Sequence, residues 1–221
     1  MSKKKKYIFL VSLITFSVYC AITIGQSWDE AYVMEHGKIT LDYLFSFGKI
    51  DKDILYRELF STIYWSLNYF ITEIFPLKYQ MQVSHLVNLS FSLGAIFGTA
   101  KVSKELFNKK VGRIVFIILF FYPIFFGHMS INSKDTIHAF SHVWIVYLTL
   151  RYLKNQNINE KANKYIIFIG ILAALSTGIQ LVFLGSLIPI ILFILFEIFL
   201  LKKIIHQNFI KKKFLYDIIK C

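Results

Sequence analysis

LGSLIPIILFILFEIFLL, residues 184–201, is the stretch of sequence that decides the fold class of this chain. It carries a single charged side chain, that of Glu197, and most of its other residues are apolar. A helix needs about 20 mostly apolar residues to cross about 30 Å of hydrocarbon, so residues 184–201 predict a transmembrane helix. A carboxylate is costly in lipid. We therefore expect Glu197, near one end of this helix, to reach toward the membrane surface or to face neighbouring helices.

Similar apolar stretches recur along the rest of the chain. The 221 residues are 56% hydrophobic, and the mean hydropathy is +0.57, whereas soluble domains average about 45–50% apolar residues. We therefore predict an all-α, polytopic membrane protein with a single transmembrane domain over residues 1–221. Its six predicted transmembrane helices are residues 7–25, 81–100, 112–128, 136–153, 165–182 and 184–201.

A long polar segment, residues 26–80, separates the first two predicted transmembrane helices. Residues 26–53 are polar and acidic, and we expect them to belong to a loop outside the membrane. Residues 54–76, ILYRELFSTIYWSLNYFITEIFP, place apolar side chains at helical spacing and polar side chains mostly on the other side. This pattern favours an amphipathic helix that lies in the membrane interface.

The distribution of basic residues predicts which loops face the cytoplasm. With residues 54–76 on the surface, the segments on the side of the N-terminus hold 19 of the 25 Lys and Arg residues. Cytoplasmic loops carry an excess of Lys and Arg, so both termini are predicted to be cytoplasmic, in the inner membrane of a bacterium. If residues 54–76 crossed the membrane, these loops would face outward. The segments are residues 1–6, 101–113, 151–164 and 202–221, with four, five, four and six basic residues.

The formal net charge of +12 does not indicate a nucleic-acid partner. The basic residues form short clusters between apolar stretches, which membrane insertion explains better than phosphate binding along a folded face. The lipid bilayer is the partner that this pattern predicts. Cys20 and Cys221 imply neither a disulfide framework nor a metal site.

Two acidic residues, Asp29 and Glu30, follow the first predicted helix almost at once. A carboxylate at the membrane surface can accept a proton from an acceptor hydroxyl or help to bind a divalent metal. Adjacent side chains point in different directions, so we expect only one of the pair to meet a substrate. The alternative is an ordinary solvated loop in which Trp28 anchors the interface.

A second polar group, residues 132–135 (NSKD), opens the predicted helix 136–153. Asn132 or Ser133 can cap that helix, with Asp135 favourable in its first turn. Alternatively, Lys134 binds a phosphate at this helix N-terminus and Asp135 orients Lys134 or a metal. Arg57, in the predicted amphipathic helix, is either part of a surface pair with Glu58 or a further phosphate ligand.

Four histidines lie at or near membrane depth. His138 and His142 have the i, i+4 spacing of metal ligands, but no third ligand is evident, so we predict no metal site from them. The other two are His85 and His128, and histidines that face a helix bundle are more often hydrogen-bonded packing residues than ligands.

The order of these features resembles the GT-C superfamily of membrane glycosyltransferases, especially its branch around the dolichyl-phosphate-mannose–protein mannosyltransferases. Residues 28–32 (WDEAY), with Gly37-Lys38 after them, are similar to the acidic motif in the first outer loop of those enzymes. Residues 85–112, which end in LFNKKVG, resemble the family's second span and the basic turn after it. Residues 132–135 resemble an Asn-Pro-Lys-Asp motif, with Ser133 in place of the proline.

The resemblance implies transfer of a sugar from a polyprenyl-phosphate donor to an unknown acceptor outside the cytoplasmic membrane. It implies that Asp29 is the catalytic base, that Glu30 supports it and that Lys134 meets the donor phosphate beside Asp135. A divalent metal is an optional cofactor in the superfamily. Members of the family are usually longer, so we expect this chain to be a reduced or truncated enzyme or one of two membrane subunits.

A transporter or export component for lipid-linked saccharides is the alternative function. Such a protein would line a path at mid-membrane with ionisable groups and use broken helices. The acidic residues lie instead mostly in the predicted outer loop, and the predicted transmembrane helices are nearly uncharged. This distribution favours the glycosyltransferase.

Overall fold

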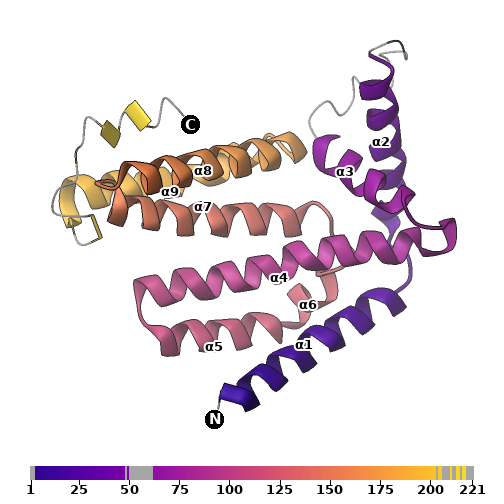
Figure 1. Cartoon of the computed structure of the whole chain (residues 1–221), viewed down its shortest axis with the longest axis horizontal. Helices are drawn as coiled ribbons and strands as arrows, with labels where there is room; N and C mark the ends of the chain where they lie inside the picture. Colours follow the sequence, from indigo (N-terminus) through magenta and orange to yellow (C-terminus); the bar gives the residue numbers. More distant parts are fainter. Residues whose placement is uncertain are drawn as a thin grey trace. The chain divides into compact units, whose positions relative to one another are not determined.

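In the computed structural model, the described part of the chain is helical throughout and contains no strand. The structure describes residues 3–47, 49, 62–202, 204, 205, 210, 213, 214, 216 and 217. The helices are α1 (Lys3–Thr23), α2 (Trp28–Phe45), α3 (Thr62–Glu73), η2 (Leu77–Tyr79), α4 (Gln80–Leu106), α5 (Lys109–Phe120), α6 (Pro123–His128), α7 (Asp135–Asn155), α8 (Asn159–Ile179), α9 (Phe183–Phe196) and η3 (Glu197–Leu201) (Figure 1). They form two compact units: Met1–Leu93 with Pro123–Thr136, and Gly94–Tyr122 with Ile137–Cys221.

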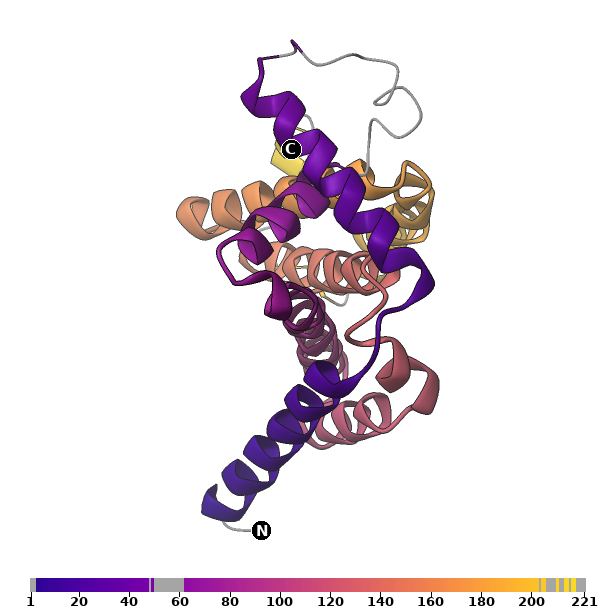
Figure 2. The same cartoon turned by 90° about the vertical axis from the view of Figure 1, so that its right-hand side faces the viewer.

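In the first unit, α1 and α2 meet at a sharp bend. Residues Tyr7–Thr23 and Trp28–Phe45 are inclined by 83° (Figure 2). Residues 26–53, which we predicted to belong to a loop outside the membrane, contain an 18-residue helix that begins at Trp28 and that we did not predict. The sequence signal for this helix is Ser27, followed three residues later by Glu30, which is the pattern of an N-terminal capping box.

Helix α2 packs closely against α3 through Gly37 (Figure 1). A Cβ atom added to Gly37 would lie 2.5 Å from the carbonyl oxygen of Trp65, so only glycine permits this approach. Helix α3 covers the second half of the amphipathic helix predicted at residues 54–76, and residues 54–61 lie outside the described part.

The first half of α4 buries a stripe of polar side chains in this unit. Asn88 lies four residues after Ser84, three after His85 and four before Ser92, so these side chains gather on one side of the helix. That face contacts α3, the end of α1 and residues 129–130, and it fixes these segments by hydrogen bonds. The stripe consists of Ser84, His85, Asn88 and Ser92, all of them buried.

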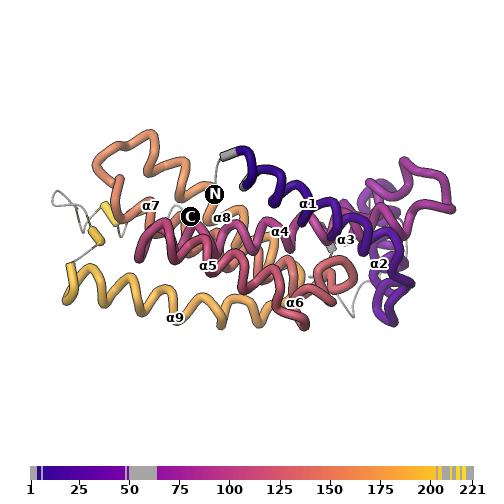
Figure 3. Tube along the Cα trace, turned by 90° about the horizontal axis from the view of Figure 1, so that it is seen from below, coloured from indigo at the N-terminus to yellow at the C-terminus, as the bar shows by residue number. Residues whose placement is uncertain are grey.

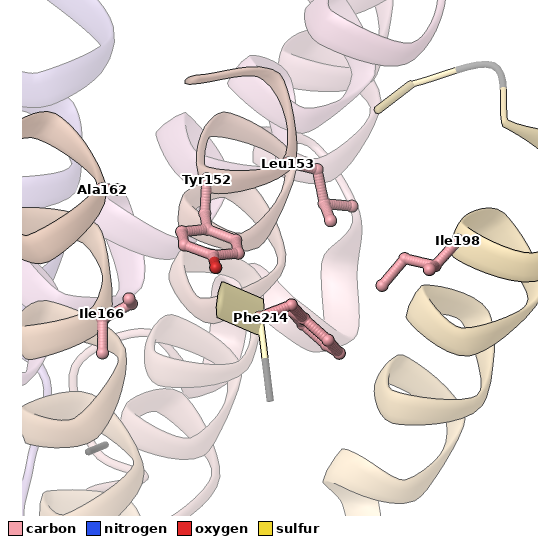
Figure 4. Close-up of a cluster of buried hydrophobic side chains, with 6 residues drawn as sticks. All are labelled: Tyr152, Leu153, Ala162, Ile166, Ile198 and Phe214. Atoms are coloured by element: carbon pink, nitrogen blue, oxygen red, sulfur yellow. The ribbon is translucent and has the colours of Figure 1, made fainter. Parts of the chain in front are cut away.

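The second unit contains the rest of α4 and the helices α5, α7, α8, α9 and η3. Helix α5 runs back along α4, and α8 is followed by α9 after a short turn (Figure 3). One hydrophobic cluster joins α7, α8 and η3 with residues near the C-terminus (Figure 4). Its members are Tyr152, Leu153, Ala162, Ile166, Ile198 and Phe214.

Glu197 is fully buried at the start of η3 and does not reach the surface. Its Oε1 accepts hydrogen bonds from the backbone N–H groups of Ile204 and Ile205. The chain can turn back on the helix in this way because Lys202 adopts a left-handed conformation, with φ of 52°. The buried carboxylate therefore satisfies amide groups after the helix end.

Three described helices are long and apolar enough to cross a membrane, and the chain is an integral membrane protein. They are Leu77–Leu106, Asn159–Ile179 and Phe183–Leu201, and the bent pair α1–α2 makes a fourth if it is counted as one crossing. This number is smaller than the six that we predicted. Our predicted spans 81–100, 165–182 and 184–201 lie largely within these three helices.

The other two predicted spans differ from the structure for local reasons. Residues 112–128 are divided between α5 and α6, because Pro123 has no N–H group to continue the α5 hydrogen-bond ladder. Helix α7 is continuous over 21 residues, but polar side chains such as His138 and His142 lower its hydropathy.

Candidate functional site

The first turn of α2 begins with a buried carboxylate. The backbone N–H of Ser27 donates a hydrogen bond of 2.6 Å to Oε2 of Glu30, as in a capping box. A negative charge is also favourable at a helix N-terminus. Glu30 is only 3% exposed, so it points into the protein and away from solvent.

His85 of α4 completes the environment of Glu30. Its Nε2 lies 2.6 Å from Oε1 of Glu30, and its Nδ1 lies 2.8 Å from the carbonyl oxygen of Ala21. A carbonyl oxygen only accepts, so Nδ1 carries a proton. The contact between Nε2 and the carboxylate then requires a second proton, which the two side chains share as an ion pair or as a neutral pair. The pair ties the end of α1 and the start of α2 to α4.

Asp29 is exposed, unlike its neighbour Glu30. It lies three residues before Tyr32 and seven before His36, so these three side chains share one face of α2. The two adjacent acids therefore have different environments. Glu30 is part of the interior of the unit, and Asp29 is available to a molecule at the surface.

Lys134 lies over aromatic rings on α2 and α3. Its Nζ is 5.9 Å from the ring centroid of Tyr32 and 5.3 Å from that of Trp65, within the range of cation–π contacts. Tyr32 and Trp65 pack edge to face with ring centroids 6.2 Å apart. The ring centroid of His36 lies 4.0 Å from that of Tyr32. We call Tyr32, His36 and Trp65 the aromatic platform. It brings Lys134 to the face of α2 that carries Asp29.

The segment around Lys134 is ordered by a helix cap. Asn132 Oδ1 accepts hydrogen bonds from the backbone N–H groups of Lys134 and Asp135, at 3.3 and 3.0 Å, and its Nδ2 donates to Asp135 Oδ2 at 2.8 Å. Asn132 therefore caps α7, as one of our two interpretations predicted. In the described contacts the carboxylate of Asp135 pairs with Asn132, which leaves the Lys134 ammonium on the aromatic platform.

Hydrogen bonds to the polar stripe of α4 hold the remaining parts of the site in place. The hydroxyl of Tyr64 donates to Asn88 Oδ1, and Asn88 Nδ2 donates to the carbonyl oxygen of Ser130 at 3.1 Å. Asn68 donates to Ser84 Oγ at 2.8 Å. Helix α3, which supplies Trp65, and the segment that leads to Lys134 are thereby anchored to the same helix face.

The predicted site residues that the structure describes lie in one unit, but they have different roles. Asp29 is exposed on the face of α2 from which Tyr32 contacts Lys134, Glu30 is buried with His85, and Asp135 serves the cap of α7. Arg57 lies outside the described residues. In the described part of the chain, no three His, Cys, Asp or Glu side chains gather as metal ligands.

A separate cavity of about 570 Å³ lies in the second unit. Its walls are mostly apolar, and its polar groups include His138, His142 and Ser186. His138 Nε2 contacts the carbonyl oxygen of Ser176 at 3.1 Å, and His142 Nδ1 lies 3.4 Å from Ser186 Oγ. The two histidines thus share a cavity wall, and each has its own hydrogen-bond partner.

His85 is the site residue whose role sequence reasoning missed. It is one of four histidines in apolar surroundings, and nothing in its own helix identifies Glu30, 55 positions away, as its partner. The capping pattern of Ser27 and Glu30 was the available signal, because it predicts a helix start at which the Glu30 carboxylate turns back to the backbone N–H of Ser27.

Comparison with models of known protein families, with curated proteins and with solved structures gave no match.

Proposed function

We propose that this chain is a GT-C-type membrane glycosyltransferase that transfers a sugar from a polyprenyl-phosphate donor to an acceptor outside the cytoplasmic membrane. The observation that carries the proposal is the position of Lys134. Its ammonium lies over Tyr32 of α2, on the helix face that presents Asp29. A cation and an exposed carboxylate, about a hundred residues apart in sequence, thus belong to one surface.

The charges on this surface suit the two parts of the reaction. Lys134 is half-buried on the aromatic platform, and its ammonium has no carboxylate partner among the described residues. The indole N–H of Trp65 is buried and lacks an acceptor among the described atoms. A phosphate oxygen supplies the acceptor that both groups need.

The chain's own residues would act on the two ends of the transfer. Asp29 accepts the proton of the acceptor hydroxyl while the oxygen of that hydroxyl forms a bond to the anomeric carbon of the sugar. The bond from that carbon to the phosphate oxygen breaks, and polyprenyl phosphate leaves with the bonding electrons. Lys134 stabilises the negative charge that develops on the leaving phosphate. Glu30 and His85 position the first turn of α2 and do not touch the substrates.

We further propose that both termini are cytoplasmic and that the surface with Asp29 and Lys134 faces outward. Four lysines precede the first apolar residues of α1, which favours a cytoplasmic N-terminus. The α5–α6 pair and α7 would complete six crossings in this arrangement. Single-cysteine labelling from outside the cell should modify position 38 but not position 109, and the reverse pattern would contradict the topology.

A transfer assay with Asp29→Asn tests the function. Membranes containing the full chain are incubated with radiolabelled polyprenyl-phosphate mannose, and in parallel with polyprenyl-phosphate glucose, and loss of label from the lipid fraction is measured. We expect Asp29→Asn to lower the rate by at least 100-fold, because general base catalysis contributes about 10²–10⁴-fold. The matched control is Glu35→Gln, which removes an exposed carboxylate from another face of α2.

If the wild type releases no more label than membranes without the protein, or if Asp29→Asn works as well as Glu35→Gln, the proposal is wrong. Equal expression and equal thermal stability of the two variants in detergent are required for the comparison, so that a folding defect is not read as a loss of catalysis.

The cavity of the second unit favours one further candidate, a transporter of lipid-linked saccharides. Two ionisable side chains, His138 and His142, line it, and ionisable residues within a membrane domain often mark transport paths. Flipping of a fluorescent lipid-linked saccharide in proteoliposomes separates the two functions. Transport that is lost in His142→Phe but kept in Asp29→Asn would support this second candidate.

A further inference from the structure

The turn between α4 and α5 gathers basic side chains on the surface of the second unit. Five cations lie within 13 residues, and all five are exposed. They are Lys101, Lys104, Lys109, Lys110 and Arg113. We call this set the basic turn.

Glu105 lies among these positions in the sequence. It does not neutralise the five cations, because its carboxylate pairs with two cations of α7. Glu105 Oε1 lies 3.2 Å from Arg151, and Glu105 Oε2 lies 2.8 Å from Lys154, both on α7. These two contacts add a guanidinium and an ammonium to the same end of the unit. The basic turn therefore carries positive charge in excess of what its own side chains can pair.

The backbone at the basic turn is held in one conformation. Asn108 caps α5 by accepting hydrogen bonds from the N–H groups of Lys110 and Val111, at 2.8 and 3.1 Å. Gly112 brings α5 against α4, since a Cβ atom at Gly112 would lie 2.7 Å from the carbonyl oxygen of Ala100. The cations thus project from a packed corner.

Exposed apolar side chains adjoin the basic turn along α5. Ile114, Ile117, Ile118 and Phe121 are each more than two-fifths exposed. They follow Arg113 directly, beside α4, which is one of the helices able to cross a membrane. Lys101, the first cation of the basic turn, adjoins aromatic rings of α7. Its Nζ lies 4.8 Å from the ring centroid of Trp144 and 5.4 Å from that of Tyr147. Aromatic side chains of this kind are enriched at the level of lipid headgroups.

We propose that the basic turn binds an anionic phospholipid. The phosphate lies among Lys109, Lys110 and Arg113, and the acyl chains lie along the exposed isoleucines of α5. A soluble phosphate would use the cations and leave the apolar border unused, whereas a phospholipid covers both. Basic clusters next to transmembrane helices attract anionic lipids for the same electrostatic reason. This site is separate from the surface with Asp29 and Lys134, which belongs to the other unit.

Native mass spectrometry of the full chain in detergent tests the proposal. The delipidated protein is titrated with phosphatidylglycerol and, separately, with phosphatidylcholine of the same acyl chains. The test variant combines Lys109→Gln, Lys110→Gln and Arg113→Gln. The control variant likewise removes three cations, through Lys38→Gln, Lys49→Gln and Lys78→Gln, all in the first unit.

We expect the wild type to bind phosphatidylglycerol more tightly than phosphatidylcholine and to lose this affinity as salt is raised. The test variant should bind phosphatidylglycerol at least 10-fold more weakly, because each surface cation contributes about a fivefold change. The control variant should bind as the wild type does. Equal binding of the two lipids, an equal effect of the two variants, or binding that salt does not weaken would overturn the proposal.

Two further measurements distinguish lipid binding from binding of free phosphate and from misfolding of the test variant. If inorganic phosphate at millimolar concentration displaces the lipid completely, the site binds phosphate alone, and the proposal is wrong. If the test variant does not fold, the charge-preserving variant with Lys109→Arg and Lys110→Arg takes its place. It should retain preferential binding of phosphatidylglycerol, and loss of that preference would count against the proposal.

Discussion

Nε2 of His85 lies 2.6 Å from Oε1 of Glu30, and both side chains are shielded from solvent. This contact joins the middle of the polar stripe on α4 to the first turn of α2. Because Asp29 directly precedes Glu30 on α2, the buried pair determines where the exposed carboxylate lies. The catalytic proposal therefore depends on two residues that would never contact a substrate.

Removal of one partner of this pair should destabilise the protein strongly. His85→Ala or Glu30→Ala leaves an unpaired buried polar group, and such changes cost about 3–5 kcal/mol. Glu30→Gln should cost much less, because its amide can donate to Nε2 of a neutral His85. Thermal unfolding in detergent, followed by intrinsic fluorescence, ranks the stabilities of the three variants. Equal losses in Glu30→Ala and Glu30→Gln would contradict the proposed shared proton.

Gly37→Ala should separate α2 from α3. The new Cβ atom would lie 2.5 Å from the carbonyl oxygen of Trp65, and backbone atoms cannot yield as a flexible side chain can. Overpacking of this kind costs about 1–3 kcal/mol. Gly127→Ala is the matched control, since its added Cβ meets no described atom within 4 Å apart from its chain neighbours and its own helix backbone. A drop in the unfolding temperature only for Gly37→Ala is expected, and an equal drop in both variants would show that the close approach is unimportant.

Tyr64 should make the protein less stable at alkaline pH. Burial raises the pKa of Tyr64 above its ordinary value of 10.0, so its hydroxyl stays protonated in the folded state while the unfolded chain ionises. The associated stability is present below pH 10 and is lost as the pH rises above it.

Comparison with Tyr64→Phe isolates this effect from the other tyrosines. At pH 7 the variant should be less stable than the wild type by about 1 kcal/mol, because it loses the hydrogen bond to Asn88. The difference in stability between the wild type and Tyr64→Phe should become smaller between about pH 9 and 11. A gap that stays constant or widens over this range would show that Tyr64 ionises as readily in the folded protein as in the unfolded chain.

Lys134→Gln should reduce sugar transfer if the ammonium meets the donor phosphate. We expect a decrease of at least 10-fold in kcat/KM for the donor, since a charge-assisted contact to phosphate is worth about 1.5–3 kcal/mol. Lys38→Gln, on exposed α2 surface, serves as the control. Full activity in Lys134→Gln, measured with the assay described for Asp29→Asn, would remove Lys134 from donor binding.

Trp65→Phe separates the indole N–H from the packing of the ring. The phenyl ring keeps most of the contact with Tyr32 and Lys134 but cannot donate a hydrogen bond. We expect the donor KM to rise about fivefold or more with little change in thermal stability. If stability falls while the donor KM stays constant, the indole N–H has only a structural role.

The sequence predicted the class of fold but not the division of its helices. The length of the apolar stretches identified α4, α8 and α9, because the thickness of the membrane sets the length of a helix that crosses it. It failed at residues 112–128, where total hydropathy hides the interruption before Pro123. It did not identify α2, whose polar composition indicated only a segment outside the membrane, although the cap at Ser27 favours a helix.

The candidate site was predictable only in part for a related reason. Asp29 and Lys134 stood out as charges next to apolar stretches, and their residue types carry that signal. The partner of Glu30 and the aromatic platform under Lys134 depend on contacts between segments far apart in the chain. No periodicity within one helix reports such contacts, so Tyr32, Trp65 and His85 could not be assigned from sequence.

The buried polar stripe of α4 has a consequence for biosynthesis. Ser84, His85, Asn88 and Ser92 lower the apolar character of this helix, and in the described part of the chain their partners lie in α1, α2, α3 and residues 129–130. A nascent α4 that left the translocon alone would expose these groups to lipid. We therefore expect α4 to be retained beside the insertion machinery until its partner segments, including residues 129–130 that follow it, have been synthesised.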